Sequence, residues 1–236
     1  EVRRKFFATM FQTFKFFSLY ANIDQFNHSE AYIPLENRQE IDKWIISLLN
    51  TLKKEVDADF AAYEPTQAAR RIQSFADSHL SNWYVRLCRR RFWKGEYSED
   101  KIAAYQTLYE CLSTISKLIA PISPYFSDWL FKNLNDVSQL ESHPSVHLVD
   151  FPQPVDGAID KALEERMDYA QRISSLVLSL RKKDNLRVRQ PLKRILLPVL
   201  NPEFQGQVEA LKDLIMAEVN VKDIEYITDT SGIIKK

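Results

Sequence analysis

Apolar residues in the first 134 positions recur every three or four residues, in five stretches separated by short polar or proline-containing segments. This spacing places apolar side chains on one face of an α-helix. The predicted helices cover residues 2–21, 37–58, 65–92, 102–119 and 125–134. Gly95 follows the third stretch, and a glycine just past a helix end favours termination there. We therefore expect this part of the chain to form a five-helix bundle.

The pattern changes after residues 135–154, which contain three prolines and two histidines and are typical of an irregular connection. The segments that follow are predicted to be a helix over 158–183, a strand over 194–200, a helix over 204–218 and a strand over 221–227. The prediction is a mainly α protein with two domains. Residues 1–150 would form the helical bundle, and residues 151–236 would form a small α-β-α-β junction subdomain.

Basic and aromatic residues are concentrated in residues 82–94, NWYVRLCRRRFWK, near the end of the third predicted helix. The segment contains five basic residues and no acidic residue. A helical wheel gives it an apolar face for the core and a polar stripe on the opposite side. The apolar face consists of Leu80, Trp83, Tyr84 and Leu87, and Val85 and Phe92 form a second apolar strip. The polar stripe consists of Asn82, Arg86, Arg89 and Trp93, with Arg90 on its flank.

This stripe and its flank, which we call the first basic surface, have two interpretations. Arginines pair bidentately with phosphate, and an exposed tryptophan or asparagine can stack on a base or hydrogen-bond to it. Alternatively, the stripe is a solvated or interdomain face. Arg91 differs because it falls on the core face, where an unpaired guanidinium is prohibitively costly. We therefore expect Arg91 to pair with an acid from another helix, Asp128 being one candidate.

A second basic cluster lies at residues 181–194, RKKDNLRVRQPLKR, where a helix gives way to a strand. Lys182 and Lys183 lie at the expected helix C-terminus, where the helix dipole alone favours cations. Arg187 and Arg189 alternate along a segment predicted to be extended, so they should point the same way. We call Lys182, Lys183, Arg187 and Arg189 the second basic surface.

The overall charge changes what these clusters mean. Lys and Arg together number 32, as do Asp and Glu, so the formal net charge of the 236 residues is zero. A basic patch is therefore a local feature and not a property of the whole surface. Hydrophobic residues make up 45% of the chain, which is typical of a globular protein and argues against intrinsic disorder. Two local basic clusters favour a polyanionic partner.

The common catalytic and metal-binding motifs do not occur. The chain has no G-x-x-x-x-G-K-[ST], G-x-G-x-x-G or H-E-x-x-H sequence. Pro144 lies between His143 and His147, so we do not expect a metal pair there. Cys88 and Cys111 cannot form a zinc site alone and suggest a reducing, intracellular setting, and Cys88 is expected to be buried. No apolar run approaches the roughly 20 residues of a membrane span.

Several longer stretches resemble one family. SNWYVRLCRRRFW, YQTLYECLSTISKLIAPISPYFSDWLFKNL and SVHLVDFP closely resemble the anticodon-binding helical bundle of isoleucyl-tRNA synthetases, which are class I enzymes. The opening VRRKFFATMFQTFKFFSLYANIDQF looks like the segment that follows the synthetase core. LRKKDNLRVRQPL and NVKDIEY resemble the junction region beyond the bundle. The resemblance covers nearly the whole chain in order.

The resemblance implies recognition of the anticodon arm of isoleucine tRNA, and cytoplasmic localisation. The family's H-I-G-H and K-M-S-K-S motifs, its editing sequence and its zinc-binding cysteine clusters are missing. We therefore expect no cofactor in this piece. ATP and Mg²⁺ would serve the full-length ligase, zinc could lie outside this piece, and the catalytic and editing domains of the same chain would be partners. The chain begins at Glu1, in mid-pattern, and is interpreted as an excised piece.

The tRNA-binding residues expected on this basis are Asn82, Arg86, Arg89, Arg90, Trp93, Lys182, Lys183, Arg187 and Arg189. Three alternatives stay open. The bundle could come from another class I synthetase, such as the valyl, leucyl or methionyl enzyme. It could be a helical module that binds protein and not RNA. Part of the first basic surface could also dock the catalytic domain.

Overall fold

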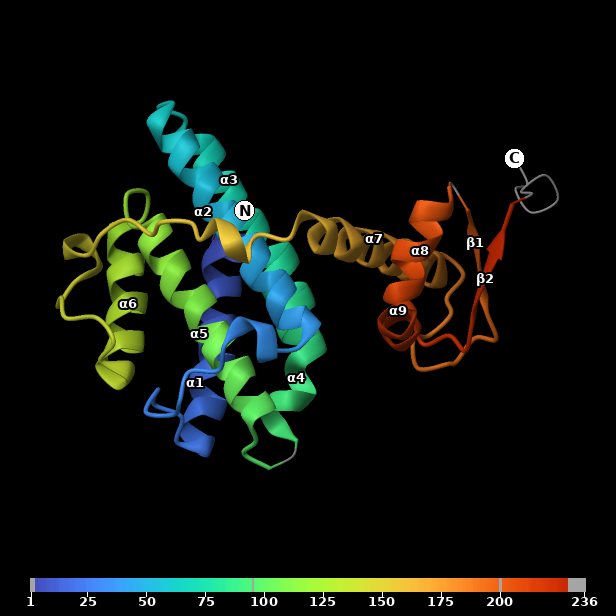
Figure 1. The fold of residues 1–236 in the computed structure, drawn as a ribbon, viewed down its shortest axis with the longest axis horizontal. Helices are drawn as coiled ribbons and strands as arrows, with labels where there is room; N and C mark the ends of the chain where they lie inside the picture. Colours follow the sequence, from blue (N-terminus) through green and yellow to red (C-terminus); the bar gives the residue numbers. More distant parts are fainter. Residues whose placement is uncertain (1–2, 95, 200, 229–236) are drawn as a thin grey trace. The chain divides into compact units, whose positions relative to one another are not determined.

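The computed structural model describes residues 3–94, 96–199 and 201–228 (Figure 1). Internal contacts divide the chain into two compact units, Glu1–Asp160 and Lys161–Lys236. The first unit is helical, and the second combines helices with a small sheet. The mainly α fold class predicted from the sequence is therefore confirmed.

The first unit contains the five predicted helices with slightly different limits. They are a π-helical turn Arg3–Phe7 continuing into α1 (Ala8–Asp24), α2 (Glu40–Ala61), the third helix Pro65–Trp93, α5 (Glu99–Ile119) and α6 (Pro124–Ser138). Proline in the first turn begins the third helix and α6, because a missing N–H costs nothing there. The Ser98 hydroxyl accepts from the Lys101 backbone N–H at 3.4 Å and caps α5. Gly95, expected to end the third helix, lies outside the described residues.

The third helix is not α-helical throughout, which the sequence did not predict. It consists of α3 (Pro65–Ser74), a π-helical segment Phe75–Val85, and α4 (Arg86–Trp93). Trp83, Tyr84 and Val85 are all buried although they are consecutive. The helix is thus packed on two sides near its middle, as the two apolar strips of the wheel predicted.

Helix α5 forms the centre of the first unit and is buried on nearly all sides (Figure 1). It packs against α1, α2, α4 and α6. Its Tyr105 ring lies 6.2 Å from the Phe17 ring of α1 and 5.1 Å from the Phe92 ring of α4, measured between centroids. Because of these contacts, α4 and the basic residues on it are held against the core of the bundle.

The connection after α6 is irregular apart from two 3₁₀ turns, Val146–Leu148 and Asp156–Ala158. Its last part is bound to α2. The Val155 N–H donates to Asn50 Oδ1 at 2.9 Å, and the Asp160 N–H donates to Ser47 Oγ at 2.8 Å. Residues 151–160 therefore pack with the bundle, although the predicted functional domains, 1–150 and 151–236, stay a prediction.

The second unit has the predicted order of helix and strand, with one helix divided. Its elements are α7 (Lys161–Lys183), β1 (Ile195–Pro198), α8 (Pro202–Ala210), α9 (Lys212–Val219) and β2 (Ile224–Ile227). The single helix predicted over 204–218 breaks at Leu211. Strands β1 and β2 pair in parallel with Ile195 opposite Ile224, and α8 and α9 form the crossover that parallel pairing requires. Both helices pack against α7.

Candidate nucleic-acid interface

Arg91 anchors the helix that carries the first basic surface. Its guanidinium donates to both carboxylate oxygens of Asp42 on α2, at 2.9 and 2.8 Å. It also donates to Asp100 at the start of α5, at 3.1 and 2.9 Å. The Asp42 side chain is fully buried, and Tyr84 donates its hydroxyl to it at 2.6 Å. The predicted ion pairing of Arg91 is confirmed.

The predicted partner of Arg91, Asp128, is wrong. Asp128 lies on α6, where it pairs with Lys132 at 2.7 Å and accepts from the Ser145 hydroxyl. Asp42 and Asp100 take the expected place because α2 and the start of α5, not α6, flank the inner side of α4. Burial opposes the charge on Arg91, but hydrogen bonds to Asp42 and its negative charge outweigh that effect and raise the pKa of the guanidinium.

The thiol of Cys88 and the phenol of Tyr84 lie beside Arg91 and are buried in the core. Burial raises the pKa of the Cys88 thiol to about 12, despite the opposing charge of Arg91. Burial and the charge of Asp42 likewise raise the pKa of Tyr84 well above its ordinary value. Both groups are therefore neutral near pH 7, and the burial predicted for Cys88 is confirmed.

All five residues of the first basic surface are exposed. The side chain of Trp93, at the last position of α4, is 55% exposed. The surface follows one side of a continuous helix: the stripe residues lie three or four positions apart, and Arg90 directly follows Arg89. The predicted exposure of these five residues is therefore confirmed. Their binding role stays a prediction.

Local contacts hold several of these side chains in place. Asn82 donates its amide to Asp77 Oδ1 at 3.0 Å, so a carboxylate already occupies part of its hydrogen-bonding capacity. Arg86 donates through Nε to the Asn82 carbonyl at 2.9 Å and lies over the Trp83 ring. Arg89 lies over the ring of Phe16, 5.9 Å from its centroid. A ring beneath a guanidinium limits its motion through a cation–π interaction.

The second basic surface is also exposed, but its local structure differs from the prediction. Residues 187–190 are not extended. The Gln190 N–H donates to the Arg187 carbonyl at 3.0 Å and closes a turn. The prediction that Arg187 and Arg189 alternate along an extended segment is therefore wrong. Lys182 and Lys183 end α7, as expected.

Arg181, the first residue of the second cluster, is 2% exposed and hydrogen-bonds to this turn. Its guanidinium donates to the carbonyls of Arg187 at 3.1 Å, Gln190 at 3.1 Å and Asn220 at 2.9 Å. The sequence contained a signal for this burial. Arg181 continues the spacing of the buried face of α7, which contains Leu163, Met167, Ala170 and Ser174.

Two further residues of the interface were missed for a different reason. Phe16 lies on α1 and Asp42 on α2, and each reaches α4 only in the folded unit. Spacing within the segment 82–94 gives no sign of either contact. The exposed Lys94, which directly follows Trp93, extends the first basic surface by one cation.

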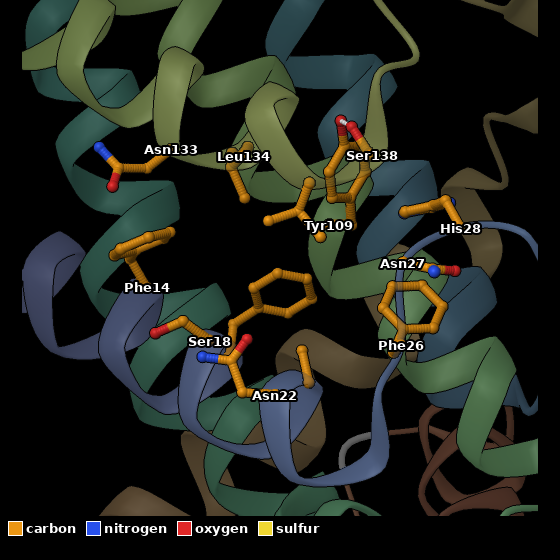
Figure 2. Close-up of a pocket in the computed structure, with 13 residues that line it drawn as sticks. Phe14, Ser18, Asn22, Phe26, Asn27, His28, Tyr109, Asn133, Leu134 and Ser138 are labelled. Carbon is orange, nitrogen blue, oxygen red and sulfur yellow. Dashed lines mark hydrogen bonds between the residues drawn. The ribbon is translucent and has the colours of Figure 1, made fainter.

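A small cavity between α1 and α6 does not belong to either surface (Figure 2). Phe14, Asn22 and Asn133 lie around it, and the His28 ring lies 4.1 Å from the Tyr109 ring (Figure 2). Its lining includes no lysine or arginine. Its volume, about 40 Å³, suits one or two water molecules and not a nucleobase.

The described parts of the chain contain neither a metal-ligand cluster nor a membrane span. Across residues 3–94, 96–199 and 201–228, no three His, Cys, Asp or Glu side chains are grouped as metal ligands. In the same residues, every helix is too short or too polar to cross a membrane.

Comparison with known proteins identifies the family. The family described as anticodon-binding domain of tRNA ligase matches residues 42–196. The chain belongs to this family. Both basic surfaces and Asp42 lie inside the matched range of the anticodon-binding domain. Helix α1, which supplies Phe16, lies outside it.

Similar proteins support the resemblance of this anticodon-binding domain to that of isoleucyl-tRNA synthetases. The chain is 56% identical over all 236 residues to an isoleucine–tRNA ligase of Cytophaga hutchinsonii and 52% identical to one of Bacteroides thetaiotaomicron. It is 40% identical, again over its full length, to an isoleucine–tRNA ligase of Clostridium tetani. The chain spans about a fifth of these relatives, 21%, 20% and 22% of their lengths.

Proposed function

We propose that this chain is the part of an isoleucine–tRNA ligase that binds the anticodon arm of isoleucine tRNA. The observation that carries the proposal is the exposure of two basic surfaces, on a protein of zero net charge, within a matched anticodon-binding domain. Local positive potential on a neutral protein attracts RNA to those places and not to the whole surface. The relatives' names support isoleucine over the valyl, leucyl and methionyl alternatives.

The residues of the first basic surface would contact different parts of the RNA. Arg86, Arg89 and Arg90 would contact backbone phosphates, which position an RNA without reading its sequence. Trp93 would stack on an unstacked loop base, and Asn82 would hydrogen-bond to a base edge with the group that Asp77 leaves available. Aromatic support beneath Arg86 and Arg89 reduces the entropy lost when these side chains bind phosphate.

The second basic surface would contact phosphates through Lys182, Lys183, Arg187 and Arg189. The remaining four-fifths of a protein as long as the relatives would supply the catalytic and editing domains that act with this chain. ATP and Mg²⁺ would bind there, zinc could be held there, and the whole ligase would work in the cytoplasm. The described side chains of this chain would need no cofactor for their own part, which is RNA binding.

The salt dependence of tRNA binding tests the proposal. Titrating the chain with isoleucine tRNA at several salt concentrations should give a log–log slope of several units, about 0.7 to 0.9 for each phosphate contacted. The Arg86→Ala/Arg89→Ala variant should lose about 1.4 to 1.8 units of that slope, by the same rule. Both side chains are exposed, so the fold should survive.

An Arg70→Ala/Lys132→Ala variant serves as the matched control, because it removes the same charge from exposed positions on α3 and α6. It should bind almost as the parent does. If the two double variants bind equally well, the first basic surface has been wrongly assigned. Binding without a steep salt dependence would instead favour a module that binds protein. Competition with valine and methionine tRNAs then tests the isoleucine assignment.

A further inference from the structure

We infer that Arg181 is a positioning residue for RNA binding by the second unit. It would act through the turn at residues 187–190, which carries Arg187 and Arg189. The inference rests on the proposed function of the second basic surface and goes beyond it, because Arg181 itself is buried and cannot reach a phosphate.

The hydrogen bonds of Arg181 are the first support. Most buried arginines pair with a carboxylate, but this guanidinium directs Nη1 and Nη2 to main-chain carbonyls. The acceptors are Arg187 and Gln190 at the two ends of the turn, both at 3.1 Å, and Asn220 at 2.9 Å. One planar group therefore connects the end of α7, the basic turn and the residue just after α9. Several donors in a fixed plane are a property of arginine that lysine lacks.

Asn220 binds the same turn at a further carbonyl. Its amide donates to the Val188 carbonyl at 2.8 Å, and its own carbonyl accepts from both Arg181 and the Leu192 N–H. Its backbone is left-handed, with φ of 51°, a conformation that asparagine tolerates better than most residues. The carbonyls of Arg187, Val188 and Gln190 are thus all engaged on the inner side.

This arrangement has a consequence for the side chains. A turn whose carbonyls are bound inward presents its side chains outward, and Arg187 and Arg189 are both exposed. Carbonyl oxygens carry partial negative charge, so turning them away also removes groups that would repel phosphate. Arg181 therefore both orders the turn and selects which of its groups face the RNA. Ordering before binding reduces the entropy cost of association.

The test is a mutant cycle in the 236-residue chain, measured as the salt slope of isoleucine tRNA binding. Arg187→Ala/Arg189→Ala should lower the slope by about 1.4 to 1.8 units if each arginine contacts one phosphate. Arg181→Met should lower it by a similar amount, although the side chain that it removes never touches RNA. Arg181→Lys retains the charge but not the planar donors, so it should resemble Arg181→Met. The triple variant should show no further loss.

The outcomes separate the inference from the proposed function. If Arg187→Ala/Arg189→Ala leaves the slope unchanged, the second basic surface does not bind RNA and the proposed function fails there. If that variant lowers the slope but Arg181→Met does not, the inference is wrong. The inference is also contradicted if the triple variant loses as much slope as Arg181→Met and Arg187→Ala/Arg189→Ala together, because such a sum indicates a general loss of structure. Should Arg181→Met not fold, Asn220→Gly keeps the left-handed backbone, releases the Val188 carbonyl and must lower the slope.

Discussion

Replacing Arg91 by methionine should destabilise the first unit by about 3–5 kcal/mol, the usual cost of breaking a buried ion pair from one side. Methionine is similar in length and apolar, so the packing around α4 should largely persist. The loss comes from Asp42, whose side chain is fully buried. Without Arg91, the Asp42 carboxylate keeps one side-chain donor among the described residues. This donor is the hydroxyl of Tyr84, at 2.6 Å.

The structure indicates which contacts matter for this magnitude. The Asp100 side chain is 43% exposed, so water can replace Arg91 there at little cost. The bidentate pair with Asp42, at 2.9 and 2.8 Å, therefore accounts for most of the effect. Since domains of this size are stable by about 5–15 kcal/mol, a loss of about 3–5 kcal/mol removes roughly a fifth or more of the stability.

Urea denaturation followed by tryptophan fluorescence measures this change. All four tryptophans, Trp44, Trp83, Trp93 and Trp129, lie in the first unit, so the signal reports that unit alone. Arg90→Met is the matched control, because its side chain is exposed and its loss should change stability by no more than about 0.5 kcal/mol. Equal midpoints for the two variants would refute the reasoning. Asp42→Asn/Arg91→Met should also cost less than the sum of the two single changes.

Two further predictions concern titratable groups in the first unit. Burial lowers the pKa of His28 to about 4, so the unfolded chain binds a proton between pH 6.5 and 4 that the folded chain does not. Stability should therefore fall as the pH drops through this range, by roughly 1–2 kcal/mol after allowance for partial exposure, and less in His28→Asn; parallel pH profiles would contradict this. Burial raises the pKa of both Cys88 and Cys111, so iodoacetamide at pH 8 should modify these thiols only after unfolding, as mass spectrometry can show. Rapid modification of the folded chain would contradict their burial.

The helices and the exposed stripe could be predicted because both depend on local spacing. An apolar residue every three or four positions defines a helix face, whatever packs against it. The same arithmetic placed Arg91 on the core face, where it must be paired. It could not identify Asp42, because the two residues are 49 positions apart and meet only when α2 packs beside the third helix.

The turn at residues 187–190, in contrast, could not be predicted from local spacing. Its sequence alternates basic and apolar residues, which locally favours an extended strand. Arg181 and Asn220 override that preference, and Asn220 is 39 positions from Arg181. The π-helical segment Phe75–Val85 could not be predicted either. It coincides with packing on both sides of the helix, and its composition gives no sign of it. Residues whose conformation depends on distant partners cannot be predicted from local patterns.

The central position of α5 affects where this protein can be divided. The family pattern begins at residue 42, inside α2, and so omits α1 entirely. Yet α1 covers α5 and α4 through Phe17 against Tyr105 and Phe16 against Phe92. A piece trimmed to the pattern would expose these rings to water and invite self-association. The smallest piece of the chain that folds by itself is therefore larger than residues 42–196, which the family pattern covers.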